Sequence, residues 1–184
     1  MRILVVHAGR EGQSAKVAAY AAARLRDKGH DCDLADLKDR RETDPAGYPA
    51  MLAVGSVHIG RHESELTRFI TRHLQTLSKI PTGFFSVSLS PGNAPGHDDE
   101  GAMRQAEAFL RECGWTPERV ETIAGALRFS RYGMMTRLFM QQLMRRFGVD
   151  ADRKHDIEYT DWRNVDRAVD GFLEAAEEKN SASP

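Results

Sequence analysis

The chain has 184 residues, of which 41% are hydrophobic and 29% charged, and its formal net charge is −1. This length suits one well-cored domain, and the balanced charge argues against binding of nucleic acid or lipid through an overall field. No apolar run reaches the roughly 20 residues of a membrane span, and Met1 leads into a short apolar strand without a signal peptide, so we expect only peripheral membrane contact.

Hydrophobic patterning predicts strands that alternate with helices. The expected strands are residues 3–7, 31–36, 51–57, 83–89 and 119–127, and the expected helices are residues 14–28, 63–77, 99–113 and 161–178. Gly29 and Asp161 are suitable residues to end the first helix and to cap the last. Residues 1–178 are therefore predicted to form one domain, followed by a disordered tail at 179–184. Cys32 and Cys113 have neither metal nor redox spacing and are expected to be free, buried thiols.

This alternation predicts an α/β fold with a doubly wound, five-stranded parallel sheet of order 2-1-3-4-5. Ligands bind such sheets outside the carboxyl ends of the strands, at the switch point between strands 1 and 3. Three loops are therefore candidates for a ligand site, at residues 8–14, 56–62 and 88–97.

The first of these loops has the features of a phosphate cradle. It joins a buried strand to a helix, so its backbone N–H groups and the helix dipole would face the ligand, and Ser14 adds a hydroxyl. Gly9 and Gly12 would let the backbone come close. The loop is neither a Walker A loop nor a Gly-x-Gly-x-x-Gly loop, and a turn without a ligand is the alternative.

The other two loops suit a flat ring. Gly55 to His62 can lay backbone donors and an apolar side chain against it, and residues 88–97 are small and polar. His58 and His62 lack a third ligand at a spacing suited to a metal. His7 could face the ligand or be a structural histidine. A mononucleotide with a planar ring fits these loops, and FMN fits best.

A basic and apolar segment follows the fifth strand. Arg128 to Phe147 contains five arginines and no acid, and its apolar residues recur at roughly helical spacing. We expect an insertion at about 128–156 whose helix, 133–147, contacts a membrane surface or a carboxylated macrocycle. Packing on the domain core or self-association into a homo-oligomer are the alternatives.

Four motifs carry a resemblance to a known family. They are Arg10-x-Gly12-Gln13-Ser14, Phe85-Ser86-Val87-Ser88-Leu89, Ile123-Ala124-Gly125-Ala126-Leu127-Arg128-Phe129-x-Arg131-Tyr132 and Tyr159-Thr160-Asp161-Trp162. From Met1 to about Leu173 the chain resembles the flavodoxin-like, FMN-dependent protoporphyrinogen IX dehydrogenases of bacteria, which pass electrons to quinone. The resemblance implies oxidation of protoporphyrinogen IX in heme biosynthesis, with menaquinone as acceptor, by a cytoplasmic protein at the inner face of the cell membrane.

The resemblance also implies which residues bind each group. The FMN phosphate would lie on Gly9, Arg10, Glu11, Gly12, Gln13 and Ser14. The isoalloxazine would lie between Ser56, Val57, His58, Ile59 and Gly60 on one side and Ser88, Leu89 and Ser90 on the other. Because guanidinium pairs well with carboxylate, we expect the substrate propionates to bind Arg128, Arg131 and Arg137, with Tyr132 and Phe129 stacked on a pyrrole ring. A surface that faces solvent or lipid headgroups is the alternative for these arginines. The flavin would carry the redox chemistry, so no catalytic side chain is expected.

The chain departs from the family at two places. Ala8 and Gly9 stand where the family loop begins with two hydroxyl residues, and His58 and Ile59 replace a polar–aromatic pair. Three other functions therefore remain open: a flavodoxin-type electron carrier, an FMN-dependent quinone reductase, and an interaction module without FMN. Carriers are usually strongly acidic, which a net charge of −1 does not match.

Overall fold

The computed structural model describes residues 1–39, 43–58, 60–89, 98–127, 142 and 156–182. Its main sheet has the parallel strand order β2-β1-β3-β5-β6. These strands are β1 (Arg2–Ala8), β2 (Asp31–Asp36), β3 (Ala50–His58), β5 (Thr82–Ser88) and β6 (Arg119–Ala124). β5 and β6 are the fourth and fifth of the predicted strands. The observed order is therefore the predicted order 2-1-3-4-5, and the predicted topology is confirmed.

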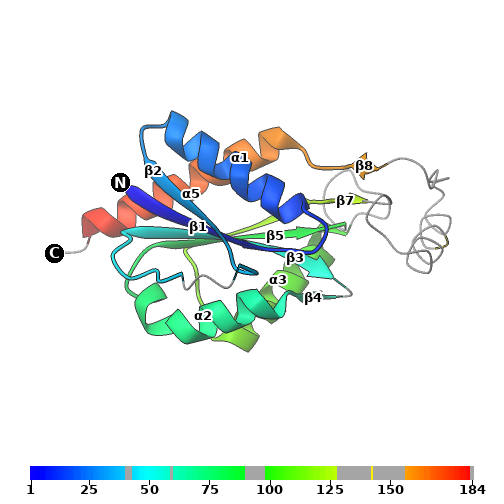
Figure 1. The fold of residues 1–184 in the computed structure, drawn as a ribbon, viewed down its shortest axis with the longest axis horizontal. Helices are drawn as coiled ribbons and strands as arrows, with labels where there is room; N and C mark the ends of the chain where they lie inside the picture. Colours follow the sequence, from blue (N-terminus) through cyan, green and yellow to red (C-terminus); the bar gives the residue numbers. More distant parts are fainter. Residues whose placement is uncertain (40–42, 59, 90–97, 128–141, 143–155, 183–184) are drawn as a thin grey trace.

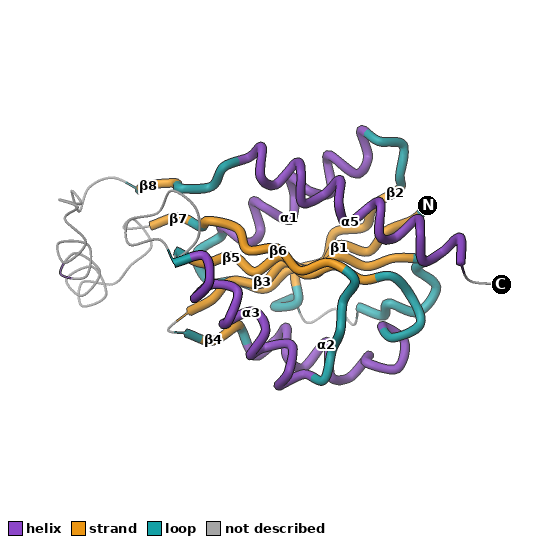
Figure 2. Tube along the Cα trace, turned by 180° about the vertical axis from the view of Figure 1, so that it is seen from behind, coloured by secondary structure: helices purple, strands orange, loops and turns teal. Residues whose placement is uncertain are grey.

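Four described helices cover the two faces of the sheet. They are α1 (Gln13–Asp27), α2 (Ser64–Leu77), α3 (Asp99–Cys113) and α5 (Trp162–Ala182). Figures 1 and 2 show α1 and α5 on one face and α2 and α3 on the other. None of the helices in the described part of the chain is long and apolar enough to cross a membrane.

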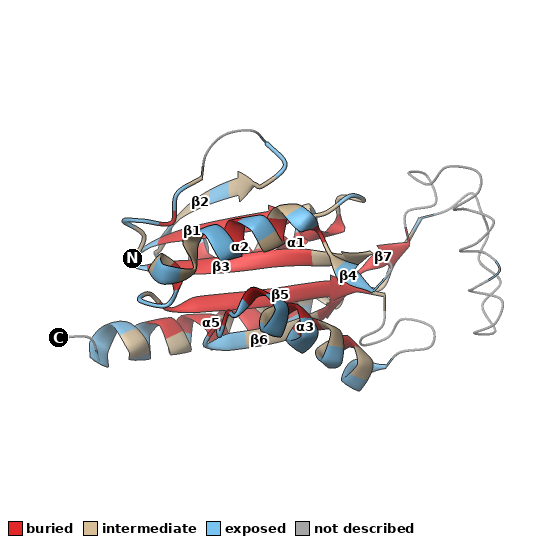
Figure 3. Cartoon of the chain, turned by 90° about the horizontal axis from the view of Figure 1, so that it is seen from below, coloured by how far each residue is buried: buried red, intermediate tan, exposed pale blue. Residues whose placement is uncertain are grey.

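The core follows from the two-residue period of the strands. Phe84 packs in the cluster beneath α2 and α3, and its neighbour Phe85 packs in the cluster beneath α1 and α5. The central strands are therefore buried on both faces (Figure 3), which is why they appear in the sequence as unbroken apolar runs rather than alternating ones. Cys113 is buried and Cys32 half-buried, and both are free, so Cys32 is less buried than predicted.

The strand predicted at 119–127 is broken at Gly125. The Gly125 N–H donates to the Ser88 carbonyl at 2.6 Å, and a Cβ at this glycine would lie 3.1 Å from that oxygen. The chain then leaves the main sheet, and β7 (Ala126–Leu127) pairs antiparallel with β8 (Ile157–Glu158). A second short strand, β4 (Arg61–His62), folds back antiparallel on β3 and was likewise not predicted.

The last helix extends beyond its predicted end. It was expected to stop at residue 178, before a disordered tail, but α5 continues to Ala182. Lys179 holds this last turn in place, because its Nζ donates to the Ile80 carbonyl at 3.0 Å and to the Glu118 carboxylate. The predicted cap at the other end is confirmed, since the Asp161 side chain accepts a hydrogen bond from Arg163 N at 3.0 Å.

Candidate functional site

The first loop lies at the carboxyl end of β1 and leads into the N-terminus of α1. Gly12 has a φ of +87°, a left-handed conformation that suits glycine, and its carbonyl accepts the first helical bond from Lys16 N at 3.0 Å. Gly12 supplies no side-chain cap, and the first turn of α1 contains no acidic residue. The partial positive charge of this helix end is therefore available to an anion.

Ser14 brings a buried hydroxyl into the same loop. Its residue is 1% exposed, and its Oγ has no hydrogen-bond partner within the described residues. A Cβ on Gly9 would lie 1.9 Å from that Oγ and 3.0 Å from the Oγ of Ser56, so only glycine fits beside the two hydroxyls. A buried hydroxyl without a partner costs about 1–3 kcal/mol. A bound phosphate oxygen would remove this cost, so the residues present fit the phosphate of a mononucleotide.

The second loop lies directly beside the first. Ser56, Val57 and His58 end β3 half-buried, and Gly60, with a φ of +74°, turns the chain into β4. Nδ1 of His58 is 4.0 Å from Oε1 of Glu11 in the first loop. The structure therefore brings these two predicted loops together, and Ile59 lies outside the described residues.

The third loop begins at the end of β5. Ser88 is buried and pairs in register with Ala124 of β6, and Leu89 is half-buried. Ser90 and the remainder of 90–97 lie outside the described residues. Asp98 caps the helix that follows, α3, since its side chain accepts a hydrogen bond from Gly101 N at 2.7 Å.

Arg10 is tied to the start of α2. Its Nε lies 3.0 Å from the carboxylate oxygens of Glu63, a side chain only 3% exposed, whereas the Arg10 side chain is 62% exposed. This ion pair fastens the first loop to the chain that leaves β4. Sequence reasoning missed Glu63, because the partner lies 53 positions away.

Burial lowers the pKa of two histidines near the loops, His7 and His62. Burial lowers the pKa of His7, against the opposing effect of Asp36, whose Oδ1 is 3.9 Å from His7 Nδ1. Burial also lowers the pKa of His62 to about 4, and its Nε2 lies 3.0 Å from Ser86 Oγ. Within the described part of the chain, no three His, Cys, Asp or Glu side chains are grouped to hold a metal.

A partly buried chain of hydrogen bonds joins the first loop to the two ends of the predicted insertion. The Gln13 amide donates to Thr160 Oγ1 at 2.7 Å, and Thr160 Oγ1 donates to the Ala124 carbonyl at 2.6 Å. Next to it, the Tyr159 N–H donates to the Gly125 carbonyl at 3.0 Å. Thr160 was visible in the sequence only as part of a family motif, with no role assigned.

The predicted substrate residues lie outside the described part of the chain. They are Arg128, Arg131, Tyr132 and Arg137, and the same holds for the helix expected at 133–147 apart from Gln142. The residues on either side of the insertion are described, and Leu127 and Ile157 are register partners in the β7–β8 ladder.

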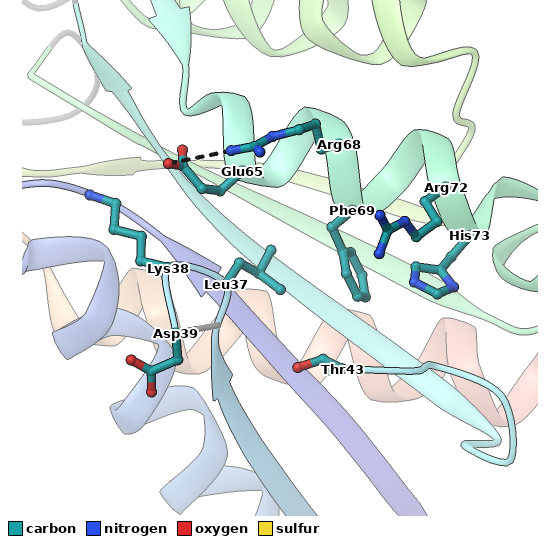
Figure 4. Close-up of a pocket in the computed structure, with 9 residues that line it drawn as sticks. All are labelled: Leu37, Lys38, Asp39, Thr43, Glu65, Arg68, Phe69, Arg72 and His73. Carbon is teal, nitrogen blue, oxygen red and sulfur yellow. Dashed lines mark ion pairs between the residues drawn. The ribbon is translucent and has the colours of Figure 1, made fainter. Parts of the chain in front are cut away.

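A cavity of about 430 Å³ lies between the segment that follows β2 and helix α2 (Figure 4). Leu37 and Phe69 give it apolar walls, and Arg72 and His73 give it polar ones. None of the three candidate loops contributes to its lining, but Lys38, which does, also bonds to Gly9 of the first loop.

Comparison with known proteins gives one consistent family. A family model for a flavodoxin domain matches residues 4–154. The chain is 30% identical over 165 residues to a protein of Escherichia coli (strain K12) named protoporphyrinogen IX dehydrogenase (quinone), covering 90% of this chain and 91% of that protein. A protein of the same name from Leishmania major is 29% identical over 174 residues, covering 93% of this chain and 74% of that protein.

Solved structures agree on the fold. A flavodoxin from the domain Archaea matches with a TM-score of 0.55 and 15% identity, covering 97% of this chain and 99% of that one. Oxidised flavodoxin 1 from Bacillus cereus matches with a TM-score of 0.55 and 11% identity, covering 95% of this chain and 98% of that one. At these identities the likeness establishes the architecture alone.

Proposed function

Because the chain belongs to the flavodoxin-domain family and to the quinone-dependent protoporphyrinogen IX dehydrogenases within it, we propose that it oxidises protoporphyrinogen IX to protoporphyrin IX. The observation that carries this proposal is the similarity to the Escherichia coli enzyme over nine-tenths of both chains. Heme biosynthesis is the process that this reaction serves.

The family and the fold support a flavin cofactor, and we propose that the flavin is FMN. The single cradle formed by Gly9, Gly12 and Ser14 at the N-terminus of α1 suits one terminal phosphate. Ser56 to His58 and Ser88 to Leu89 end neighbouring strands at the same sheet edge and would flank the ring. When bound, FMN would supply the two-electron redox chemistry.

The overall reaction balances with a quinone as acceptor. Protoporphyrinogen IX loses six electrons and six protons, and three quinones take them up to give three quinols. The chain's own contribution is to bind and orient the reactants, and we assign no side chain as a catalytic acid or base. Arg128, Arg131 and Arg137 would pair with the substrate propionates, and Tyr132 would stack on a pyrrole ring.

The position of the quinone in a bilayer gives the basic segment a second proposed role. The apolar and cationic pattern of residues 133–147 suits peripheral contact with an anionic membrane at its cytoplasmic face. Such contact would bring the flavin site to the acceptor without a membrane-spanning helix.

An anaerobic titration tests this function. Protoporphyrinogen IX is added to the FMN-loaded protein without quinone, and we expect the flavin absorbance to bleach while porphyrin fluorescence appears. Arg128→Ala and Arg131→Ala should raise KM for the porphyrinogen. Arg104→Ala on α3 is the matched control, since its side chain is 64% exposed and lies outside the three loops. Flavin that binds but stays oxidised would refute the dehydrogenase and favour a carrier or a quinone reductase.

A further inference from the structure

The turn that follows β2 is fixed at the same edge of the sheet as the first loop. Leu37 N donates to the His7 carbonyl at 2.9 Å, which anchors the turn to the end of β1. Lys38 N donates to Asp36 Oδ1 at 2.9 Å, and Asp39 N donates to the Asp36 carbonyl at 3.0 Å. The Lys38 backbone is therefore held beside the first loop, although it belongs to none of the three loops that the sequence singled out.

The Lys38 side chain reaches into the first loop. Its Nζ donates to the Gly9 carbonyl at 2.5 Å. Lys38 also lines the neighbouring cavity, and Figure 4 shows its side chain extended away from Phe69, Arg72 and His73. An ammonium has three N–H donors, and the Gly9 carbonyl takes one of them.

The charge of Lys38 acts at the carboxyl end of β1 and at the start of α2. Burial is the main cause that lowers the pKa of His7, and Lys38 adds to this effect, while Asp36 and Asp39 oppose it. The pKa of Glu65, in the first turn of α2, is lowered chiefly by a backbone hydrogen bond and also by Lys38. A positive charge is thus present at the sheet edge where the first loop lies.

Apart from its backbone N–H groups and Ser14, the first loop has few side-chain donors for a doubly charged phosphate. Ala8 and Gly9 have no hydroxyl, and the Arg10 guanidinium is paired with the Glu63 carboxylate. We propose that Lys38 is a phosphate-binding residue, whose ammonium bridges the Gly9 carbonyl and the terminal phosphate of the flavin. This inference rests on the proposed flavin site and is independent of the porphyrin substrate. It also predicts preference for FMN over riboflavin, which lacks the phosphate.

Parallel titrations with FMN and riboflavin test the proposal. Lys38→Met should weaken FMN binding about tenfold, the usual size of a charge-assisted contact, and leave riboflavin binding within about twofold of wild type. Lys38→Arg should keep most of the FMN affinity because it keeps the charge. Lys28→Met is the control and should change neither affinity, since Lys28 is the C-cap residue of α1, at the far end of the helix from the first loop, and its Nζ is 2.9 Å from Oδ1 of Asp170.

Three results would overturn the proposal. An equal loss of FMN and riboflavin binding would make Lys38 a structural support of the loop, and an unchanged FMN affinity would remove it from the site. If the wild-type chain bound neither flavin, the cofactor assignment would fail first. Titration with inorganic phosphate, followed by 31P NMR, would then decide: binding lost in Lys38→Met supports the phosphate contact, and no binding to wild type overturns it.

Discussion

Replacing Ser14 with alanine should stabilise the cofactor-free chain and weaken FMN binding at the same time. The Ser14 hydroxyl is buried without a partner among the described residues, and such a group costs about 1–3 kcal/mol. Allowing for the small void left behind, we expect the free energy of unfolding to rise by about 1 kcal/mol. A hydrogen bond to a charged phosphate contributes about 1.5–3 kcal/mol, so FMN should bind about 10 to 100-fold more weakly.

Ser86→Ala is the matched control, because Ser86 is also 1% exposed but is hydrogen-bonded. Its Oγ lies 3.0 Å from His62 Nε2, so the alanine would leave a buried ring nitrogen unpaired and should lower the free energy of unfolding by about 1–2 kcal/mol. Urea unfolding without cofactor measures both stabilities, and quenching of FMN fluorescence measures the affinity.

The signs of these changes decide whether the reasoning holds. If Ser14→Ala destabilises the cofactor-free chain as Ser86→Ala does, the Ser14 hydroxyl has a partner in the folded state and the cradle geometry is wrong. If the FMN affinity of Ser14→Ala equals that of wild type, Ser14 does not contact the phosphate.

Three further changes test the parts around this loop. Gly12→Ala should lower the free energy of unfolding by about 1 kcal/mol, because alanine is strained at a φ of +87°, and a variant as stable as wild type in urea would contradict this. Thr160→Val should cost about 2 kcal/mol in the same assay, since it breaks the bonds to Gln13 and to the Ala124 carbonyl, whereas Thr160→Ser should cost less than about 1 kcal/mol. The pKa of His62 is lowered from 6.5 to about 4 in the folded state, so as the pH falls the unfolded chain takes up the proton before the folded chain does. About 3 kcal/mol of the free energy of unfolding that is present above pH 6.5 should therefore be lost by about pH 4. Urea unfolding across this range should show a smaller loss for His62→Gln, and an equal loss would assign the effect to other groups.

The order of strands and helices could be predicted because both patterns are local. A strand buried on both faces is a continuous apolar run, as in Ile3 to Val6, and an amphipathic helix repeats with its own period. The break at Gly125 could not be predicted in this way, since apolar residues continue on both sides of it. It depends on the Ser88 carbonyl, which belongs to another strand. The added turn of α5 likewise depends on the Ile80 carbonyl, 99 positions before Lys179.

The candidate site likewise contains residues that local sequence patterns could predict and one that they could not. Gly9, Gly12 and Ser14 could be predicted because a strand-to-helix loop needs glycines and a hydroxyl wherever it holds a phosphate. Lys38 could not, because it stands in a polar connector whose composition resembles any solvated turn. Lys38 comes to lie beside Gly9 because β1 and β2 pair with His7 opposite Asp36, and this pairing of distant segments is not visible in the sequence.

The two ends of residues 128–156 meet near the first loop, where we propose that the flavin binds. Leu127 and Ile157 are register partners, and Thr160 then joins Ala124 to Gln13. Pairing the ends of a long segment offsets much of the entropy that its closure costs, and here the paired ends are hydrogen-bonded to the first turn of α1. The described ends of the basic segment are therefore anchored next to the first loop. This anchoring suits the proposed dehydrogenase, which needs substrate and flavin close together, whereas a carrier that only exchanges electrons with partner proteins does not need it.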